Sequence, residues 1–83
     1  MSKIKSEYQD LDKYKNINDD IWYCKKDTYI RHNPYGPAVI YKNGYKEYVI
    51  ENKLHRLDGP AVICSDGEEQ YWINDTELTK EKF

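Results

Sequence analysis

The sequence predicts an all-β fold, an antiparallel meander of β-hairpin repeats that forms one curved sheet. The main observation is an internal repeat, because residues 54–63 (LHRLDGPAVI) resemble residues 31–40 (RHNPYGPAVI), about 23 positions upstream. The dipeptides Asn43-Gly44 and Asp66-Gly67 recur at the same offset and are typical of hairpin turns. No helical pattern separates the expected strands, which argues against a parallel βαβ arrangement. One hairpin cannot bury an apolar face, whereas a row of hairpins can.

Composition indicates one small, aromatic-rich domain. The chain has 83 residues, of which nine are Tyr, two are Trp and one is Phe, and this content argues against disorder. The net charge is −2. It is spread unevenly, since residues 21–67 carry seven Lys/Arg against five Asp/Glu and residues 68–83 carry two against five. Such a mild polarity predicts no strong nucleic-acid binding and no membrane binding.

The sequence shows no apolar run of membrane-spanning length and no signal peptide. A cytoplasmic location is therefore expected, or the host cytosol if the chain is viral. Cys24 and Cys64 are then expected to be reduced, because cytosolic thiols rarely form disulfides.

Residues 1–20 are expected to form an N-terminal extension or cap in front of a hairpin-repeat domain over residues 21–83. Apolar side chains at helical spacing favour a short helix or a loose segment, followed by a first strand over residues 13–17. An extended lead-in is the alternative, since isolated helices of this length are weak. The residues at helical spacing are Ile4, Tyr8 and Leu11, with Ser2 as the cap and Asn18-Asp19-Asp20 as the following turn.

The repetitive part is expected to alternate strands and turns. Asn43-Gly44 predicts a two-residue hairpin turn, in which both residues take positive φ. Gly36-Pro37 excludes a helix interior there. Residues 76–83 look like half a repeat, expected to end as a short helix or a frayed tail. The expected strands cover residues 21–26, 38–41, 45–50, 59–64 and 70–73.

The repeated residues resemble a variant of the MORN repeat (membrane occupation and recognition nexus), over about residues 21–78. The resemblance implies a curved antiparallel sheet used for binding, most often to proteins and in some cases proposed for lipids. Repeats of this kind recur in hypothetical proteins of bacteriophages, giant viruses and bacteria, and they carry no catalytic residues. The residues that match are Leu54-His55-Arg56, Asp58-Gly59-Pro60-Ala61, Asp66-Gly67 and Tyr71-Trp72, with a weaker copy in Arg31-His32, Gly36-Pro37-Ala38 and Asn43-Gly44.

Two pairs of basic residues have two interpretations. Arg31, His32, His55 and Arg56 could form a basic groove for a nucleotide-like anion, because Arg offers a planar fork and His titrates near neutral pH. Alternatively they are structural, with Arg56 paired to Asp58 and His55 bonded to the backbone at a turn.

Three aromatic residues are candidates for contacting a protein partner: Tyr45, Tyr48 and Trp72. In alternating strands Tyr45 and Tyr48 fall on opposite faces, so one aromatic set is expected to be exposed and to mark an interface.

No enzyme, metal or cofactor is expected. Cys24, His32, His55 and Cys64 are suitable zinc ligands, but their spacing fits no known finger. The two His residues have no nucleophile at a known spacing.

The sequence thus favours a small non-catalytic binding protein of phage or viral type, which engages a host protein, for example to inhibit a defence system. The alternatives are sequestration of a nucleotide-like anion and a purely structural repeat module. Exposed sheet edges make homo-oligomer formation a further expectation.

Overall fold

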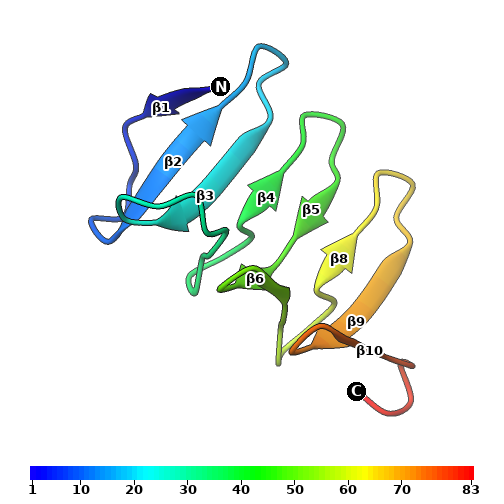
Figure 1. The fold of residues 1–83 in the computed structure, drawn as a ribbon. Helices are drawn as coiled ribbons and strands as arrows, with labels where there is room; N and C mark the ends of the chain where they lie inside the picture. Colours follow the sequence, from blue (N-terminus) through cyan, green and yellow to red (C-terminus); the bar gives the residue numbers. More distant parts are fainter.

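The structure, a computed structural model, describes residues 1–83 and contains strands and turns but no helix (Figure 1). It is an open antiparallel meander, as the repeat pattern predicts. The strands are β1 (Ser2–Ile4), β2 (Leu11–Lys15), β3 (Ile21–Lys25), β4 (Val39–Ile40), β5 (Lys46–Glu47), β6 (Val49–Ile50), β7 (Lys53–Leu54), β8 (Val62–Ile63), β9 (Glu69–Ile73) and β10 (Thr76–Leu78).

Neighbouring strands in the sheet are mostly neighbours in the chain. The main sheet has eight strands in the order β1-β2-β3-β4-β5-β8-β9-β10, and every pair is antiparallel. Strands β6 and β7 form a separate two-stranded hairpin between β5 and β8. The result is an elongated molecule of 39 × 25 × 17 Å.

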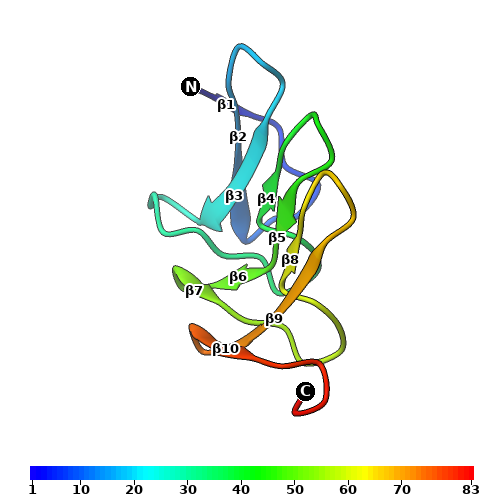
Figure 2. The same ribbon diagram turned by 90° about the vertical axis from the view of Figure 1, so that its right-hand side faces the viewer.

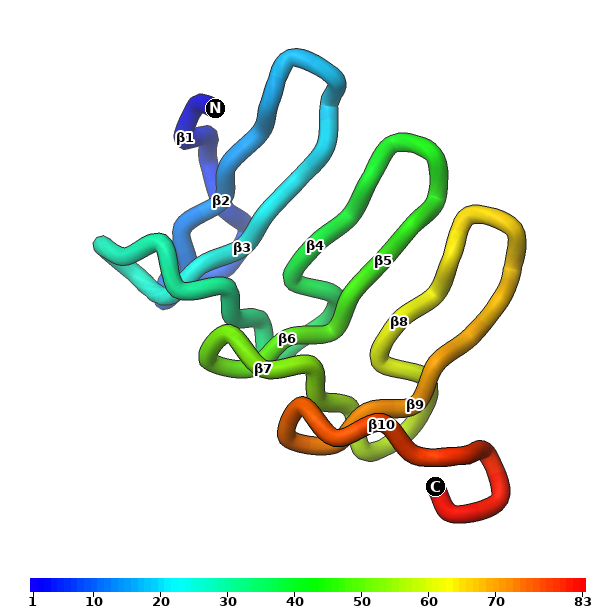
Figure 3. Tube along the Cα trace, turned by 45° about the vertical axis from the view of Figure 1, so that its right-hand side comes forward, coloured from blue at the N-terminus to red at the C-terminus, as the bar shows by residue number.

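Two rows of hairpins are arranged one after another along the length of the molecule. The longer hairpins, β2–β3, β4–β5 and β8–β9, lie side by side with their tips at one edge (Figures 1 and 3). The shorter ones, including β6–β7 and β9–β10, project from the opposite edge and turn away from the sheet (Figure 2). The chain bends at Tyr48, which interrupts the single strand expected over residues 45–50. The Tyr48 N–H donates to the Ala61 carbonyl, 2.7 Å away, which extends the contact between β5 and β8 by one residue.

The expected N-terminal helix is wrong, and the extended alternative is correct. Ile4 and Leu11 belong to two different strands, and β2 pairs with β3 along its whole length. Leu11 is only 1% exposed, because it packs inside the sheet structure. Strand pairing prevails because a lone helix of this length has no partner to bury its apolar side chains. Residues 76–83, which were expected to end as a short helix or a frayed tail, form β10 over residues 76–78 and a turn over residues 80–82.

The loop at Asn43-Gly44 differs from the two-residue turn that was predicted. The Tyr41 N–H donates to the Tyr45 carbonyl over 2.8 Å, so three residues form the loop. Only Gly44 has positive φ, at 101°. This combination is a three-residue loop with a glycine bulge. The loop over residues 65–67 repeats it, with Gly67 at a φ of 92°.

The two-residue turns with paired positive φ values occur instead in the short hairpins. Glu51 and Asn52 have φ values of 48° and 67°, and Asn74 and Asp75 have 49° and 66°. Asn and Asp tolerate this left-handed conformation better than other residues with a side chain.

The core is small and follows the repeat. Ala38 and Ala61 are completely buried, and the next residues, Val39 and Val62, are 1% and 3% exposed. The shared Ala-Val dipeptide therefore supplies the same part of the core in each unit, which accounts for its recurrence in the sequence.

Candidate functional site

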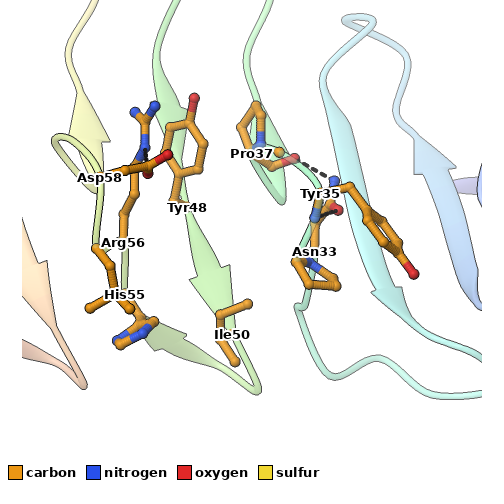
Figure 4. Close-up of a pocket in the computed structure, with 11 residues that line it drawn as sticks. Asn33, Tyr35, Pro37, Tyr48, Ile50, His55, Arg56 and Asp58 are labelled. Atoms are coloured by element: carbon orange, nitrogen blue, oxygen red, sulfur yellow. Dashed lines mark hydrogen bonds and ion pairs between the residues drawn. The ribbon is translucent and has the colours of Figure 1, made fainter.

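A groove lies between the two crossover loops that precede β4 and β8 (Figure 4). Its volume is about 470 Å³. One wall is the loop over residues 33–37 and the other is the loop over residues 55–58, with Tyr48 and Ile50 between them. We call this the repeat groove. The residues that line it are Asn33, Pro34, Tyr35, Gly36, Pro37, Tyr48, Ile50, His55, Arg56, Leu57 and Asp58.

The Arg56 side chain is held in place on several sides. Its guanidinium carbon lies 3.9 Å from the centre of the Tyr48 ring, which is a cation–π contact. Nε donates to Asp58 Oδ1 over 3.1 Å, and Nη1 donates to the Pro60 carbonyl over 3.1 Å. Figure 4 shows the guanidinium beside the Tyr48 ring. Arg56 therefore presents a preorganised guanidinium, paired with the exposed Asp58 carboxylate, to the groove.

Gly59 makes room for this arrangement. A Cβ atom at position 59 would lie 2.9 Å from Arg56 Cζ and 3.1 Å from Nη1. The equivalent Gly36 has nothing closer than 4.0 Å. Only at the second glycine of the repeat would a β-carbon therefore force a neighbouring side chain to move.

Asn33 occupies in the first loop the position that Arg56 occupies in the second. It is 4% exposed, and its Nδ2 donates to the Pro37 carbonyl over 3.0 Å. Its Oδ1 accepts from the Tyr35 N–H over 2.9 Å. An amide and a guanidinium thus anchor the same proline carbonyl in successive units. The two walls of the groove therefore have equivalent backbone contacts, but the side chain that makes them is an amide on one wall and a guanidinium on the other.

The two histidines have equivalent backbone contacts. His32 Nδ1 accepts a hydrogen bond from the Glu51 N–H at 3.0 Å, and His55 Nδ1 accepts one from the Asn74 N–H at 3.1 Å. Each imidazole thereby holds the first residue of a two-residue turn. The two contacts of the structural interpretation, Arg56 to Asp58 and His55 to a turn backbone, are both present.

The structure does not bring the four basic residues together. His55 and Arg56 line the repeat groove, whereas Arg31 and His32 do not. The Arg31 guanidinium instead lies 3.7 Å from the Glu47 carboxylate. The expected four-residue basic groove is therefore absent, and Asp58 offsets the charge of Arg56 in the groove that exists.

The three candidate aromatic residues are all half-buried and do not form one patch. Tyr48 lies in the repeat groove. Tyr45 does not line this groove, and its hydroxyl donates to the Glu47 carboxylate. Burial and this carboxylate raise the pKa of Tyr45. The indole N–H of Trp72 donates to Gln70 Oε1 over 3.1 Å.

Other apolar side chains are more exposed than these three. Leu57 and Tyr35, 70% and 57% exposed, lie on opposite walls of the repeat groove. Tyr29, in the hairpin after β3, is 77% exposed. Sequence reasoning missed all three. Leu57 and Tyr35 do carry a signal, because both are large apolar residues in loops that end in Gly-Pro.

The cysteines are free thiols, and burial raises the pKa of Cys24. No three His, Cys, Asp or Glu side chains are grouped so that they could hold a metal ion. None of the structure's elements is a helix capable of crossing a bilayer.

The fold and the groove define an open, all-β hairpin-repeat domain with a surface cleft between successive units. Comparison of this chain with known proteins finds no matching family model, no matching curated protein and no matching solved structure.

Proposed function

We propose that this chain is a small non-catalytic binding module that takes up a segment of another protein in the repeat groove. The observation that carries the proposal is Leu57, an exposed aliphatic side chain on the rim of a groove that also contains the Tyr48–Arg56 stack. Binding energy in protein interfaces concentrates in Tyr, Trp and Arg side chains that are already held in place. An exposed apolar residue next to such an anchor is typical of a contact surface.

The chemistry of the groove favours a protein segment over a nucleotide-like anion. Arg56 already pairs with Asp58, and Arg31 and His32 lie elsewhere. A free anion would have to compete with that carboxylate. A peptide can instead cover Leu57 and hydrogen-bond to the polar edges of the two loops.

The narrower parts of the proposal depend on the repeat resemblance alone. On that basis we propose that the chain is a MORN-like repeat protein, and that its partner is a host protein engaged in the cytosol by a phage or viral protein, as an inhibitor of host defence would be. The hydrogen bonds that recur at a fixed sequence offset support an internal repeat, but they identify neither its family nor the partner. Sequestration of an anion and a purely structural role stay as alternatives.

Site-specific photo-crosslinking tests the binding proposal. A photoreactive amino acid is placed at position 57, and a matched control carries it at position 17, because Ile17 is also exposed but lies in the loop between β2 and β3. We expect a defined protein adduct from position 57 only, in extracts of cells that express the chain. An excess of unlabelled wild-type chain should suppress the adduct, whereas the Leu57→Asp variant should not.

The identified partner is then purified and its affinity measured directly. Loss of one buried anchor typically weakens binding by about 10-fold or more. Leu57→Asp should therefore weaken the complex by at least that factor, and Ile17→Asp should leave it unchanged. Equal adducts from both positions, or equal affinity of both variants, would rule out the groove as the binding site.

A further inference from the structure

The two ends of the sheet carry free strand edges of equal length. Strand β1 ends the sheet on one side and β10 on the other, and each has three residues. An unpaired strand edge exposes backbone donors and acceptors that can pair with another chain.

The C-terminal edge also lacks a contact that the earlier units make. The backbone N–H of Arg31 donates to Asn52 Oδ1, and that of Leu54 donates to Asp75 Oδ1, each over 2.8 Å. Glu77 follows Leu54 by the same 23 positions that separate Leu54 from Arg31. No turn residue of the chain bonds to the Glu77 backbone. Glu77 is therefore the third equivalent position. Its backbone N–H, unlike those of Arg31 and Leu54, has no acceptor from the side chain of a turn residue.

The directions of the two edge strands are compatible. Because each strand in the order is antiparallel to the next, β1 runs with β3, β5 and β9, while β10 runs against them. A second copy displaced along the sheet would therefore bring its β1 antiparallel to β10. Pairing of β10 with β1 of the second copy would therefore continue the antiparallel order of the sheet.

The side chains are compatible as well. Lys3 is opposite Tyr14, which is opposite Trp22, and these cross-strand partners share one face of the sheet. The same face continues across β4, β5 and β8 to β9, where Trp72 is opposite Glu77. Pairing centred on these residues would place the Lys3 ammonium, which already lies 3.1 Å from Asp12 Oδ2, beside the carboxylate of Glu77 as a second acidic partner.

Symmetric pairing of like edges is disfavoured by the same residues. Two β1 strands centred on Lys3 would place two ammonium groups opposite each other, and two β10 strands would do the same with Glu77 carboxylates. Like charges directly opposite each other destabilise a strand pair, whereas opposite charges stabilise it.

We propose that this chain associates head to tail with a second copy of itself, β10 of one molecule pairing antiparallel with β1 of the next and Glu77 facing Lys3. The contact is heterologous, so it leaves one β1 and one β10 free and can repeat along an open row. It uses the ends of the sheet and leaves the repeat groove uncovered, so it is independent of the proposed partner binding.

Sedimentation equilibrium over a concentration range up to about 1 mM tests the proposal, because so short an edge gives weak binding. The average mass should rise above the 10.0 kDa of one chain and continue past twice that value. A mass that stays at one chain would overturn the proposal, and so would a mass that stops at a dimer, which indicates a symmetric pair.

Three variants separate edge pairing from non-specific association. Glu77→Pro removes the outward N–H of an edge position, which proline tolerates, and should return the mass to one chain. Glu77→Lys and Lys3→Glu should each associate at least fivefold more weakly than the wild type, while an equimolar mixture of the two should recover binding between unlike chains. Circular dichroism confirms that each variant is folded. Association that persists in folded Glu77→Pro, or no recovery in the mixture, would contradict the model of β10–β1 pairing.

Discussion

Arg31 and Asn52 are joined by two hydrogen bonds, one in each direction. The Arg31 N–H donates to Asn52 Oδ1 over 2.8 Å, and the Asn52 N–H donates to the Arg31 carbonyl over 2.8 Å. Leu54 and Asp75 make the same two contacts at 2.8 and 2.9 Å. We call this pair of bonds the hairpin clamp. These bonds connect each short hairpin to the preceding one. Their Asn or Asp residue has a positive φ, of 67° at Asn52 and 66° at Asp75.

The first prediction concerns the clamp at Asn52. Asn52→Ala removes the acceptor for the Arg31 N–H and replaces Asn, which tolerates a φ of 67°, with a residue that tolerates it less well. Both effects act against folding, and together they should lower the free energy of unfolding by about 1–2 kcal/mol. Urea denaturation measures the change.

Two further variants at position 52 separate the two effects. Asn52→Gly removes only the acceptor and should cost about half as much, since glycine accepts positive φ. Asn52→Asp should stay within about 0.5 kcal/mol of the wild type, because Asp75 already performs this role in the next unit. A loss for Asn52→Asp as large as that for Asn52→Ala would refute the clamp as the cause.

The second prediction concerns His55. Its Nδ1 accepts from the Asn74 N–H, so His55→Ala should lower stability by about 1 kcal/mol. His55→Asn keeps an acceptor at a similar distance from the backbone and should recover part of that loss. Thermal unfolding of the three proteins provides the comparison, and identical losses for both substitutions would show that the acceptor is unimportant.

The third prediction compares the two glycines of the Gly-Pro-Ala segments. Gly59→Ala introduces a Cβ 2.9 Å from Arg56 Cζ, which should push the guanidinium off the Tyr48 ring and cost about 1–2 kcal/mol. Gly36→Ala meets no atom closer than 4.0 Å. It should be neutral or stabilising by up to about 1 kcal/mol, because alanine restricts the unfolded chain.

Gly59→Ala also tests the groove. Because it displaces the Arg56 guanidinium, it should weaken binding of the partner identified by crosslinking, whereas the exposed control Ile17→Asp should leave binding intact. Equal stability of Gly59→Ala and Gly36→Ala would mean that Arg56 can move aside without cost.

The fourth prediction concerns acid stability. The Asp27 N–H and the Lys3 ammonium bind the nearly buried Asp12 carboxylate, and they lower the pKa of Asp12. A carboxyl group whose pKa is lower in the folded state stabilises the fold above its unfolded pKa. That stabilisation is lost as the pH falls below about 4 through the folded value. Wild-type stability should therefore decline in acid.

Asp12→Asn is the matched variant, because it cannot titrate. It should be less stable than the wild type at neutral pH, and the difference should shrink as the pH falls toward 2. Urea midpoints at several pH values give this comparison. Parallel curves for the two proteins would show that other carboxyl groups, such as Glu7 and Glu51, whose pKa values are also lowered, dominate the acid response.

Much of the fold could be predicted because the residues that repeat have local roles. Gly-Pro cannot sit inside a helix, Asn-Gly and Asp-Gly mark turns, and Ala-Val fills the same buried site twice. The N-terminal helix was a wrong prediction because Ile4 and Leu11 share a helical spacing by chance and lie in separate strands. The turn type at Asn43-Gly44 was also wrong, since only the second residue takes positive φ.

The candidate site was harder to predict. His55, Arg56 and Tyr48 do line one groove, but Arg31 and His32 do not, because the position equivalent to Arg56 in the earlier loop is Asn33. Equivalent positions are visible only once the hydrogen bonds can be compared. Leu57 was missed although it is a large apolar residue in a loop that ends in Gly-Pro, because its 70% exposure follows only from the structure.

By itself the sequence determined the all-β class, the repeat length and the places where the chain turns, since backbone conformation depends on local residue chemistry. The tertiary structure decided which side chains share a groove, which face each aromatic residue occupies and which strand edges stay unpaired. Those features depend on the register between strands, and a shift of one residue would reverse every side chain from one face of the sheet to the other.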